Sequence, residues 1–238
     1  MDTPKLESTL GIVFKDKDLL EQALVHRSYL NENPRFRLGH NERLEFLGDA
    51  VLELIVTQAL YGRFPEKPEG ELTSLRAALV NAAMLAEVSS RLGLNDHLLL
   101  SRGEAKDTGR ARHFILANAF EAVVGAIYLD RGYEPAREFA ARTLLPELQR
   151  VMAAGLYKDP KSLFQEEAQE RVGLTPSYEV LREWGPDHDK HFVLGVYLGP
   201  ELVAEGQGPS KQTAEVDAAR QALEVKGWDS HLASGDTG

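Results

Sequence analysis

Three carboxylates at helical spacing stand at the start of a long apolar helical pattern, and they constrain this chain more than any other feature. Residues 50–56 are mostly apolar, and neither Gly nor Pro lies between Asp49 and Tyr61, which predicts a buried or nearly buried helix. At about 100° per residue, Glu42, Glu45 and Asp49 fall within an arc of roughly 60°. Because neighbouring carboxylates repel one another, a positive partner is expected on that face.

Mg²⁺ is the simplest positive partner for this acidic face. It takes oxygen ligands from one or two carboxylates and completes its octahedron with water and phosphate oxygens. The alternative is a solvated acidic stripe, which is the commoner explanation for acids at helical spacing. The apolar run beside these carboxylates favours the metal site, because solvated acids do not require such a setting.

A second apolar helical pattern, residues 114–129, is interrupted only by Asn118 and Glu121, which are neighbours at i and i+3. A carboxylate in so apolar a segment is costly to bury unless it is paired or bound to a metal. Glu121 is therefore either a further metal ligand or a buried acid that bonds to a local Arg. Gly125 in the same pattern is expected to permit close helix packing.

Glu69 follows a clear break in the pattern, residues 64–70, which holds two prolines and a glycine. The residue lies near the start of the next predicted helix, where the helix dipole favours an acid. Its spacing alone supports this capping role and a functional role equally.

Composition indicates an ordinary globular protein and argues against one class of partner. The chain has 238 residues, no cysteine and a net charge of −10. The lack of cysteine excludes disulfides and thiolate metal sites and fits a cytoplasmic protein. We expect no membrane partner, since there is no signal-peptide pattern and no apolar window of about 18 residues. Taken alone, the negative charge argues against a nucleic-acid partner, because affinity for phosphates normally comes from Lys and Arg.

The hydrophobic pattern changes character near residue 153. We predict an all-α domain over residues 1–153, a linker over 154–159, a small α+β domain over 160–227 and a disordered tail over 228–238. A pair of helices is expected within residues 5–30, with a cap at 16–18 before the second. Further helices of the first domain are expected at 42–61, 72–88, 114–129 and 135–152. The second domain is expected to run α-β-β-β-α, with its strands at 177–184, 191–198 and 201–205.

Both predicted domains carry motifs of a known family. The stretch HNERLEFLGD at residues 40–49 closely resembles the signature of the ribonuclease III endonuclease domain. The blocks ALVHRS at 23–28, PEG at 68–70 and ILANAFEA at 115–122 match further motifs in the same order. Residues 160–227 resemble a double-stranded RNA-binding domain, with its Gly-Pro-x-His turn at 185–188 and its Ser-Lys helix start at 210–211.

This resemblance implies a homodimeric nuclease domain that hydrolyses duplex RNA with Mg²⁺, for which Mn²⁺ is a possible substitute. The expected products carry 5′-phosphates and two-nucleotide 3′ overhangs, and the expected substrates are structured RNAs such as ribosomal and messenger precursors. Glu45, Asp49 and Glu121 match metal ligands of the family, with Asn118 at a fourth metal-ligand position. The remaining matches are two acids that complete the cluster or position substrate, Glu42 and Glu69, and the side chain that inserts across the dimer interface, Phe46.

In the second domain the resemblance implies three RNA contacts, because duplex RNA is recognised through its shape, 2′-hydroxyls and phosphates. The first helix would contact one minor groove through Ser162, Gln165, Glu166 and Gln169. The turn would contact the next groove through Pro186 and His188. Ser210 and Lys211 would bind the phosphates between the two grooves.

The chain departs from the family pattern at two points. Asn118 stands where the family has Asp, and an amide oxygen brings no negative charge to a metal. Residues 161–225 hold six Lys or Arg against twelve Asp or Glu, a net charge of about −6, which is unusual for an RNA binder. We therefore expect weaker RNA binding and a shallower salt dependence than in a basic relative.

Three hypotheses follow from these residues. The leading one is a double-strand-specific, Mg²⁺-dependent endoribonuclease. The second is a protein that binds duplex RNA without cutting it, because Asn118 disables the metal site. The third, an acidic helical protein with an unrelated partner, leaves the second domain unexplained.

Overall fold

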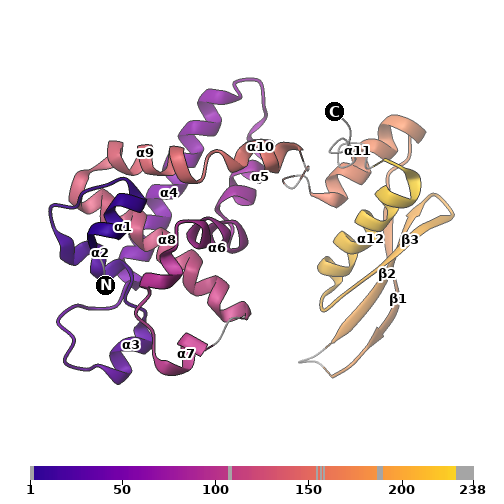
Figure 1. The fold of residues 1–238 in the computed structure, drawn as a ribbon. Helices are drawn as coiled ribbons and strands as arrows, with labels where there is room; N and C mark the ends of the chain where they lie inside the picture. The colour runs from indigo at the N-terminus through magenta and orange to yellow at the C-terminus, as the bar shows by residue number, and fades with distance from the viewer. Residues whose placement is uncertain are drawn as a thin grey trace. The chain divides into compact units, whose positions relative to one another are not determined.

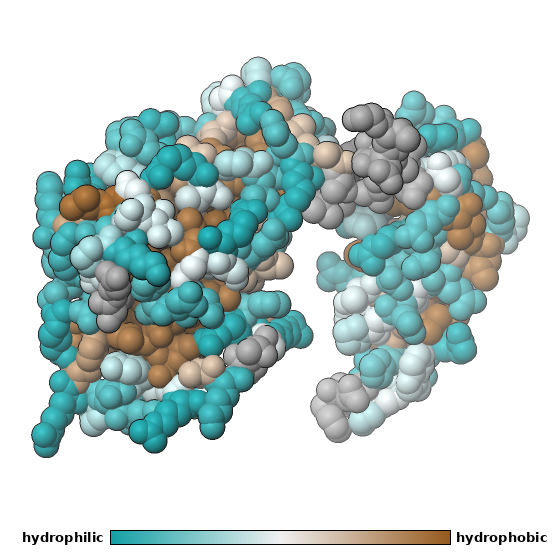
Figure 2. Space-filling model, in the orientation of Figure 1, coloured by the Kyte–Doolittle hydropathy of each residue, from teal (hydrophilic) through white to brown (hydrophobic). Residues whose placement is uncertain are grey.

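The structure, a computed structural model, describes residues 3–106, 109–153, 155, 157, 159–186 and 190–228. The chain divides between Arg150 and Val151 into two compact units. Figure 1 shows a helical first unit and a second unit in which helices accompany a sheet. Figure 2 shows hydrophilic side chains over most of the visible face of each unit, with apolar patches between them. The predicted fold class, an all-α domain followed by a small α-β-β-β-α domain, is confirmed.

The helices of the first unit are short except for two. The elements are α1 (Thr3–Leu10), α2 (Lys17–Ala23), α3 (Arg27–Glu32), α4 (Glu42–Arg63), α5 (Glu69–Val80), α6 (Ala82–Arg91), η1 (Leu94–His97), α7 (Arg102–Lys106), α8 (Arg110–Arg131), α9 (Tyr133–Thr143) and α10 (Glu147–Ala153), which crosses the division between the units. The two long helices, α4 and α8, pack against each other and carry the two predicted groups of polar side chains.

Two glycines set the distance between α4 and α8. A Cβ atom on Gly48 would lie 1.7 Å from the carbonyl oxygen of Glu121, and one on Gly125 would lie 2.2 Å from the carbonyl oxygen of Leu44. The helices therefore cross in direct backbone contact, and any larger side chain at either position would drive them apart. The close packing expected at Gly125 is confirmed. The crossing places the first turns of α4 beside the middle of α8.

The start of α4 is fixed by Asn41, which is only 2% exposed. Its backbone N–H donates to the carbonyl of Val25 at 2.9 Å, and its side-chain amide donates to the carbonyl of Ala23 at 3.2 Å. Its own carbonyl accepts from the N–H groups of Leu44 and Glu45. Because a buried amide must be paired, this residue anchors the acidic end of α4 to the end of α2.

The second unit is a three-stranded antiparallel sheet in the order β1-β2-β3. Its elements are α11 (Pro160–Val172), β1 (Ser177–Trp184), β2 (His191–Leu198), β3 (Glu201–Gly208) and α12 (Lys211–Lys226). The core between sheet and helices includes Phe164 and Val196. Trp228 was predicted to belong to a disordered tail, but it is buried and stacks on Phe164 with 5.5 Å between ring centroids. Residues 154, 156, 158 and 229–238 of the predicted linker and tail lie outside the described residues.

One expectation about membranes needs correction. The sequence was expected to hold no apolar window long enough to span a bilayer, but α8 meets that test by length and composition. Within the first unit 61% of this window is buried, and α8 packs against α2, α4, α6 and α9. Its apolar character is thus accounted for by its place in the core.

Candidate active site

The α4 helix presents its three acids near its first two turns. Glu45 is half-buried, whereas Glu42 and Asp49 are exposed. Glu42 lies 3.5 Å from the guanidinium of Arg27 and 3.7 Å from the ring of His40. Glu42 therefore already has a positive neighbour in Arg27, which distinguishes it from the two acids further along the helix.

Asn118 and Glu121, both half-buried, project from α8 toward these acids. The side chain of Asn118 forms a hydrogen bond with the carboxylate of Glu45, in which the amide N–H is the donor. Burial and the negative charge of Glu42 together raise the pKa of Glu45, while the bond from Asn118 opposes this shift. The crossing of α4 and α8 thus brings the predicted residues of both helices into one centre.

Glu121 reports most clearly on the electrostatics of this centre. Its pKa is raised from 4.5 to about 7, first by burial and then by the negative charges of Asp49 and Glu45. No arginine or lysine in the described part of the chain bonds to Glu121. The alternative in which this acid pairs with a local Arg therefore finds no support. Glu45, Asp49, Asn118 and Glu121 are named the acid centre below.

The donor set of the acid centre consists of oxygen atoms, which suits a hard divalent cation. Over the described ranges, no three His, Asp or Glu side chains are arranged as a ready-made metal cage. The negative charges of Asp49 and Glu45 contribute to the raised pKa of Glu121, so these carboxylates oppose one another electrostatically. The residues fit a cation that neutralises them.

Glu69 does not join the acid centre. It is exposed at the start of α5 and lines a pocket of about 420 Å³ together with Tyr61 and Lys67. Tyr61 lies twelve residues beyond Asp49 on α4, a separation of roughly 18 Å along the helix axis. Within one chain, Glu69 therefore lies at the opposite end of α4 from the other acids.

Phe46 extends from α4 into solvent with 82% of its surface exposed, directly beside Glu45. Leu54 and Tyr61 continue an exposed apolar stripe on the same side of the helix, at eight and fifteen residues from Phe46. Large apolar side chains gathered on one helix face indicate a surface for protein contact.

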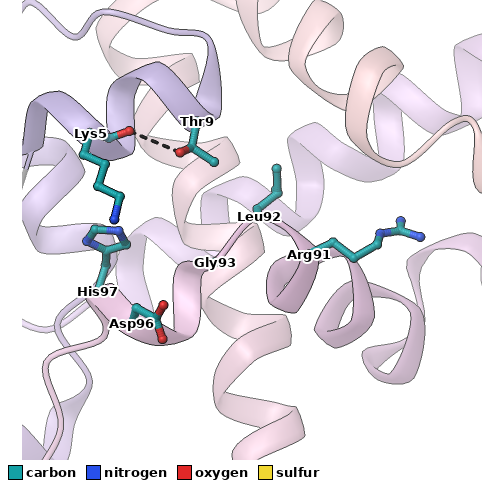
Figure 3. Close-up of a pocket in the computed structure, with 7 residues that line it drawn as sticks. All are labelled: Lys5, Thr9, Arg91, Leu92, Gly93, Asp96 and His97. Carbon is teal, nitrogen blue, oxygen red and sulfur yellow. Dashed lines mark hydrogen bonds between the residues drawn. The ribbon is translucent and has the colours of Figure 1, made fainter.

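A further pocket, of about 430 Å³, lies away from every predicted residue. It is lined by Lys5, Thr9, Arg91, Leu92, Gly93, Asp96 and His97. Figure 3 shows the Lys5 amine directed toward the ring of His97, and Arg91 is already paired with Glu147 at 2.6 Å. This pocket mixes both signs of charge at the end of α6, and nothing in it resembles a catalytic arrangement.

The predicted RNA-contacting residues of the second unit lie on three elements. Ser162, Gln165, Glu166 and Gln169 are all exposed on α11, and the Ser162 hydroxyl donates to its N-cap residue Asp159 at 3.0 Å. Pro186 is exposed after β1, whereas His188 lies outside the described residues. Ser210 caps α12 by accepting from the N–H of Thr213 at 3.1 Å.

Lys211 is the first residue of α12, and a second lysine, Lys190, which the sequence did not single out, contacts the same aromatic ring. The amines of Lys211 and Lys190 lie 5.9 and 5.8 Å from the centroid of the Phe192 ring. One lysine comes from α12 and the other from just before β2. Nothing in the spacing of the sequence links them, since only the sheet brings them together. Asn41 was missed too, and its only signal was a polar residue directly before an apolar helix.

Comparison with known proteins identifies the class. Residues 16–148 match the family model described as Ribonuclease-III-like, and residues 160–226 match the Double-stranded RNA binding motif. Together with the acid-bearing helical unit, these matches define an endoribonuclease that hydrolyses double-stranded RNA.

Relatives extend this likeness along nearly the whole chain. Ribonuclease 3 of Enterococcus faecalis is 45% identical over 224 residues, covering 93% of this chain and 96% of its own. Ribonuclease 3 of Pelotomaculum thermopropionicum is 46% identical, covering 92% and 90%. The nuclease domain of ribonuclease III from Campylobacter jejuni is 44% identical, with a TM-score of 0.55 over 60% of this chain and 95% of that one. The chain belongs to the ribonuclease III family, whose members use a divalent metal.

Proposed function

We propose that the acid centre hydrolyses phosphodiesters of duplex RNA with Mg²⁺, leaving 5′-phosphates and two-nucleotide 3′ overhangs. The crossing of α4 and α8, which brings these oxygen donors from two helices together, carries this proposal. The raised pKa of Glu121 agrees with it, since a cation would favour the ionised form of an acid buried among like charges. We further propose that the enzyme acts in the cytoplasm on precursors of ribosomal and messenger RNA.

Each residue of the acid centre has a distinct part in this proposal. Glu45, Asp49 and Glu121 supply carboxylate oxygens, and Asn118 supplies its amide oxygen or orients Glu45 through the bond that they share. These oxygen atoms would hold a divalent cation, and the chemistry that it would supply there is activation of a water molecule and stabilisation of charge on the leaving oxygen. Mn²⁺ is expected to substitute, because it accepts the same oxygen ligands.

Asn118 favours a second candidate function, duplex RNA binding with impaired cleavage. It is neutral, and it lowers the pKa of Glu45 by a side-chain hydrogen bond without bringing a negative charge to the site. A neutral ligand in place of a carboxylate lowers affinity for Mg²⁺.

Two further features support assembly as a homodimer. Phe46 and the exposed apolar stripe on α4 require a partner surface. Glu69 lies far from the acid centre of its own chain, so in a symmetric pair it is available to the centre of the other copy. The position of Glu42 beside Arg27 and His40 suits a role in placing substrate.

The second unit is proposed to hold the duplex through Ser162, Gln165, Glu166, Gln169, Pro186, His188, Ser210 and Lys211. The exposed polar row on α11 suits 2′-hydroxyl contacts in a minor groove. Lys211 and Lys190 together suit the backbone phosphates.

Cleavage of a long RNA duplex with Mg²⁺ tests the proposal, with Asn118→Asp compared against the chain as it stands. Short duplex products from both proteins establish the nuclease with Asn118 as a working ligand. Products from the Asp variant alone, with equal RNA binding by both, establish the binding function. If neither protein cuts, even with Mn²⁺, the proposed metal centre is wrong.

A further inference from the structure

A large aromatic side chain is exposed on α8 beside the acid centre. Phe114 is 47% exposed and lies four residues before Asn118 and seven before Glu121. At about 100° per residue, both residues lie within roughly 40° of Phe114 around the helix, and Asn118 is about one turn away. Single exposed aromatic residues are common on protein surfaces, so this position alone decides nothing.

Arg110 supplies a second observation at the same place. Its guanidinium carbon lies 5.8 Å from the centroid of the Phe114 ring, within the range of a cation–π contact. In the described part of the chain no carboxylate pairs with Arg110. Arg110 and Phe114 therefore continue, toward the N-terminus of α8, the helix face that carries Asn118 and Glu121.

The neighbouring Arg112 has a different role. Its side chain is partly buried and donates to the carbonyl of Ala105 at 3.3 Å, which ties α7 to the start of α8. Because Arg112 is committed to this bond, Arg110 is the arginine of this turn that solvent and ligands reach.

We propose that Arg110 and Phe114 form a substrate-positioning pair for the RNA strand that enters the acid centre. The guanidinium binds a backbone phosphate beside the one at the centre, and the ring holds the guanidinium in place while it packs against the ribose. This inference rests on the function proposed above.

Charge and geometry both support this pair. The carboxylates of the acid centre repel RNA, so a nearby cation is needed to attract the backbone without neutralising the ligands. Arg110 lies eight residues, roughly 12 Å along the axis, before Asn118, which is far enough to leave the centre ionised. Guanidinium binds phosphate with two parallel hydrogen bonds, and duplex RNA offers phosphates and sugars rather than base faces.

The experiment uses the full chain and its Asn118→Asp form, each with Arg110→Gln, Phe114→Leu or Phe114→Tyr. Binding of a 30-base-pair RNA duplex is measured without divalent metal over a series of salt concentrations, and cleavage is measured with Mg²⁺. Arg110→Gln is expected to weaken binding about fivefold to tenfold and to lower the salt slope by about 0.7–0.9, the value of one phosphate contact.

The aromatic variants test the ring separately. Phe114→Leu keeps an apolar side chain but removes the π face, and about threefold weaker binding is expected, whereas Phe114→Tyr keeps binding within twofold. Arg110→Gln combined with Phe114→Leu should bind no worse than Arg110→Gln alone, because the two residues act as a unit. In cleavage, KM should rise while kcat stays within about twofold.

Arg63→Gln is the matched control, since its guanidinium lies 6.0 Å from the ring of Phe64 at the far end of α4. The inference is wrong if Arg110→Gln binds like this control, or if kcat falls while KM is unchanged. Normal binding and cleavage by all variants overturn the inference alone. A parent chain that neither binds nor cuts duplex RNA overturns the proposed function and this inference with it.

Discussion

Gly48→Ala tests whether the α4–α8 crossing builds the acid centre. The new methyl group would lie 1.7 Å from the carbonyl oxygen of Glu121 and 2.8 Å from the backbone nitrogen of Gly125. Backbone atoms of a packed helix cannot move aside as a flexible side chain does, so α4 and α8 must separate. Overpacking of this kind costs about 3 kcal/mol, which lowers the melting temperature of a unit of about 150 residues by roughly 6–12 °C.

The same helix offers a control of the same chemistry. Gly62 on α4 has no atom within 4 Å of the position of a new Cβ. Gly62→Ala should therefore stabilise the protein by about 0.5–1 kcal/mol, since Ala is the better helix former. The difference between the two variants isolates the steric cost at the crossing.

Two optical probes separate the two units in one sample. Both tryptophans, Trp184 and Trp228, belong to the second unit, so their fluorescence follows that unit during heating. Far-UV circular dichroism is dominated by the helices of the first unit. Gly48→Ala should lower the dichroism transition, leave the fluorescence transition in place and abolish metal-dependent cleavage in the Asn118→Asp form. An unchanged dichroism transition would refute the argument that direct backbone contact positions the acids.

Three more outcomes are expected. Because the pKa of Glu121 is higher folded, about 7, than its ordinary value of 4.5, the free energy of unfolding without divalent metal should fall as pH rises between those values. Glu121→Gln should flatten this fall in denaturant titrations. The salt slope of RNA binding should be shallow, and Lys211→Gln should reduce it by about 0.7–0.9; a slope as steep as that of a strongly basic relative would contradict the assignment. Phe46→Asp should shift the chain toward monomer in sedimentation experiments, while Val13→Asp, at another exposed apolar residue, should not; equal behaviour of the two removes Phe46 from the interface.

The sequence predicted helices and strands well where the apolar periodicity ended at turn-forming residues. The helix at 42–61 and the strands at 177–184 and 191–198 lie where apolar periodicity ended at turn residues. Where an apolar pattern continued across a weak break, the sequence predicted one helix instead of two. The stretch 135–152 was expected to form one helix, but the chain bends after Thr143 into α10. Buried apolar residues occur on both sides of the bend, Phe139 and Ala140 before it and Leu148 and Val151 after it, so the apolar pattern does not mark the break.

The third strand shows a different limit. It was expected to end at Glu205, before Gly206 and Gly208, because glycines usually mark turns. The strand instead continues to Gly208, which pairs with Phe192 on β2. A Cβ at Gly206 would lie 2.0 Å from the backbone nitrogen of Ala218 on α12, so this position has room only for glycine. This glycine serves a close helix–sheet contact. A sequence alone does not distinguish the two uses of glycine, because the contact is with a residue twelve positions away.

The acid centre was predictable for a reason that does not extend to its surroundings. Polar groups are costly to bury in apolar helices, and this conflict can be recognised within the sequence of a single helix. It marks Glu45, Asp49, Asn118 and Glu121. Arg110 and Phe114 are exposed and Lys190 is only partly buried. Many side chains are tolerated at such positions, so the role of these residues can be inferred only from their neighbours in space.

The charge of the chain links metal and RNA at the acid centre. With a net charge of −10, the protein repels a polyanion overall, so attraction must be local. Under the proposed function, a cation at the acid centre would neutralise carboxylates that oppose the RNA backbone, and the RNA phosphate would supply further oxygen ligands to the cation. Metal and RNA would then each strengthen the binding of the other by the same factor. Because Asn118 is neutral where the family has Asp, we expect it to weaken the binding of metal alone more than the binding of metal and RNA together.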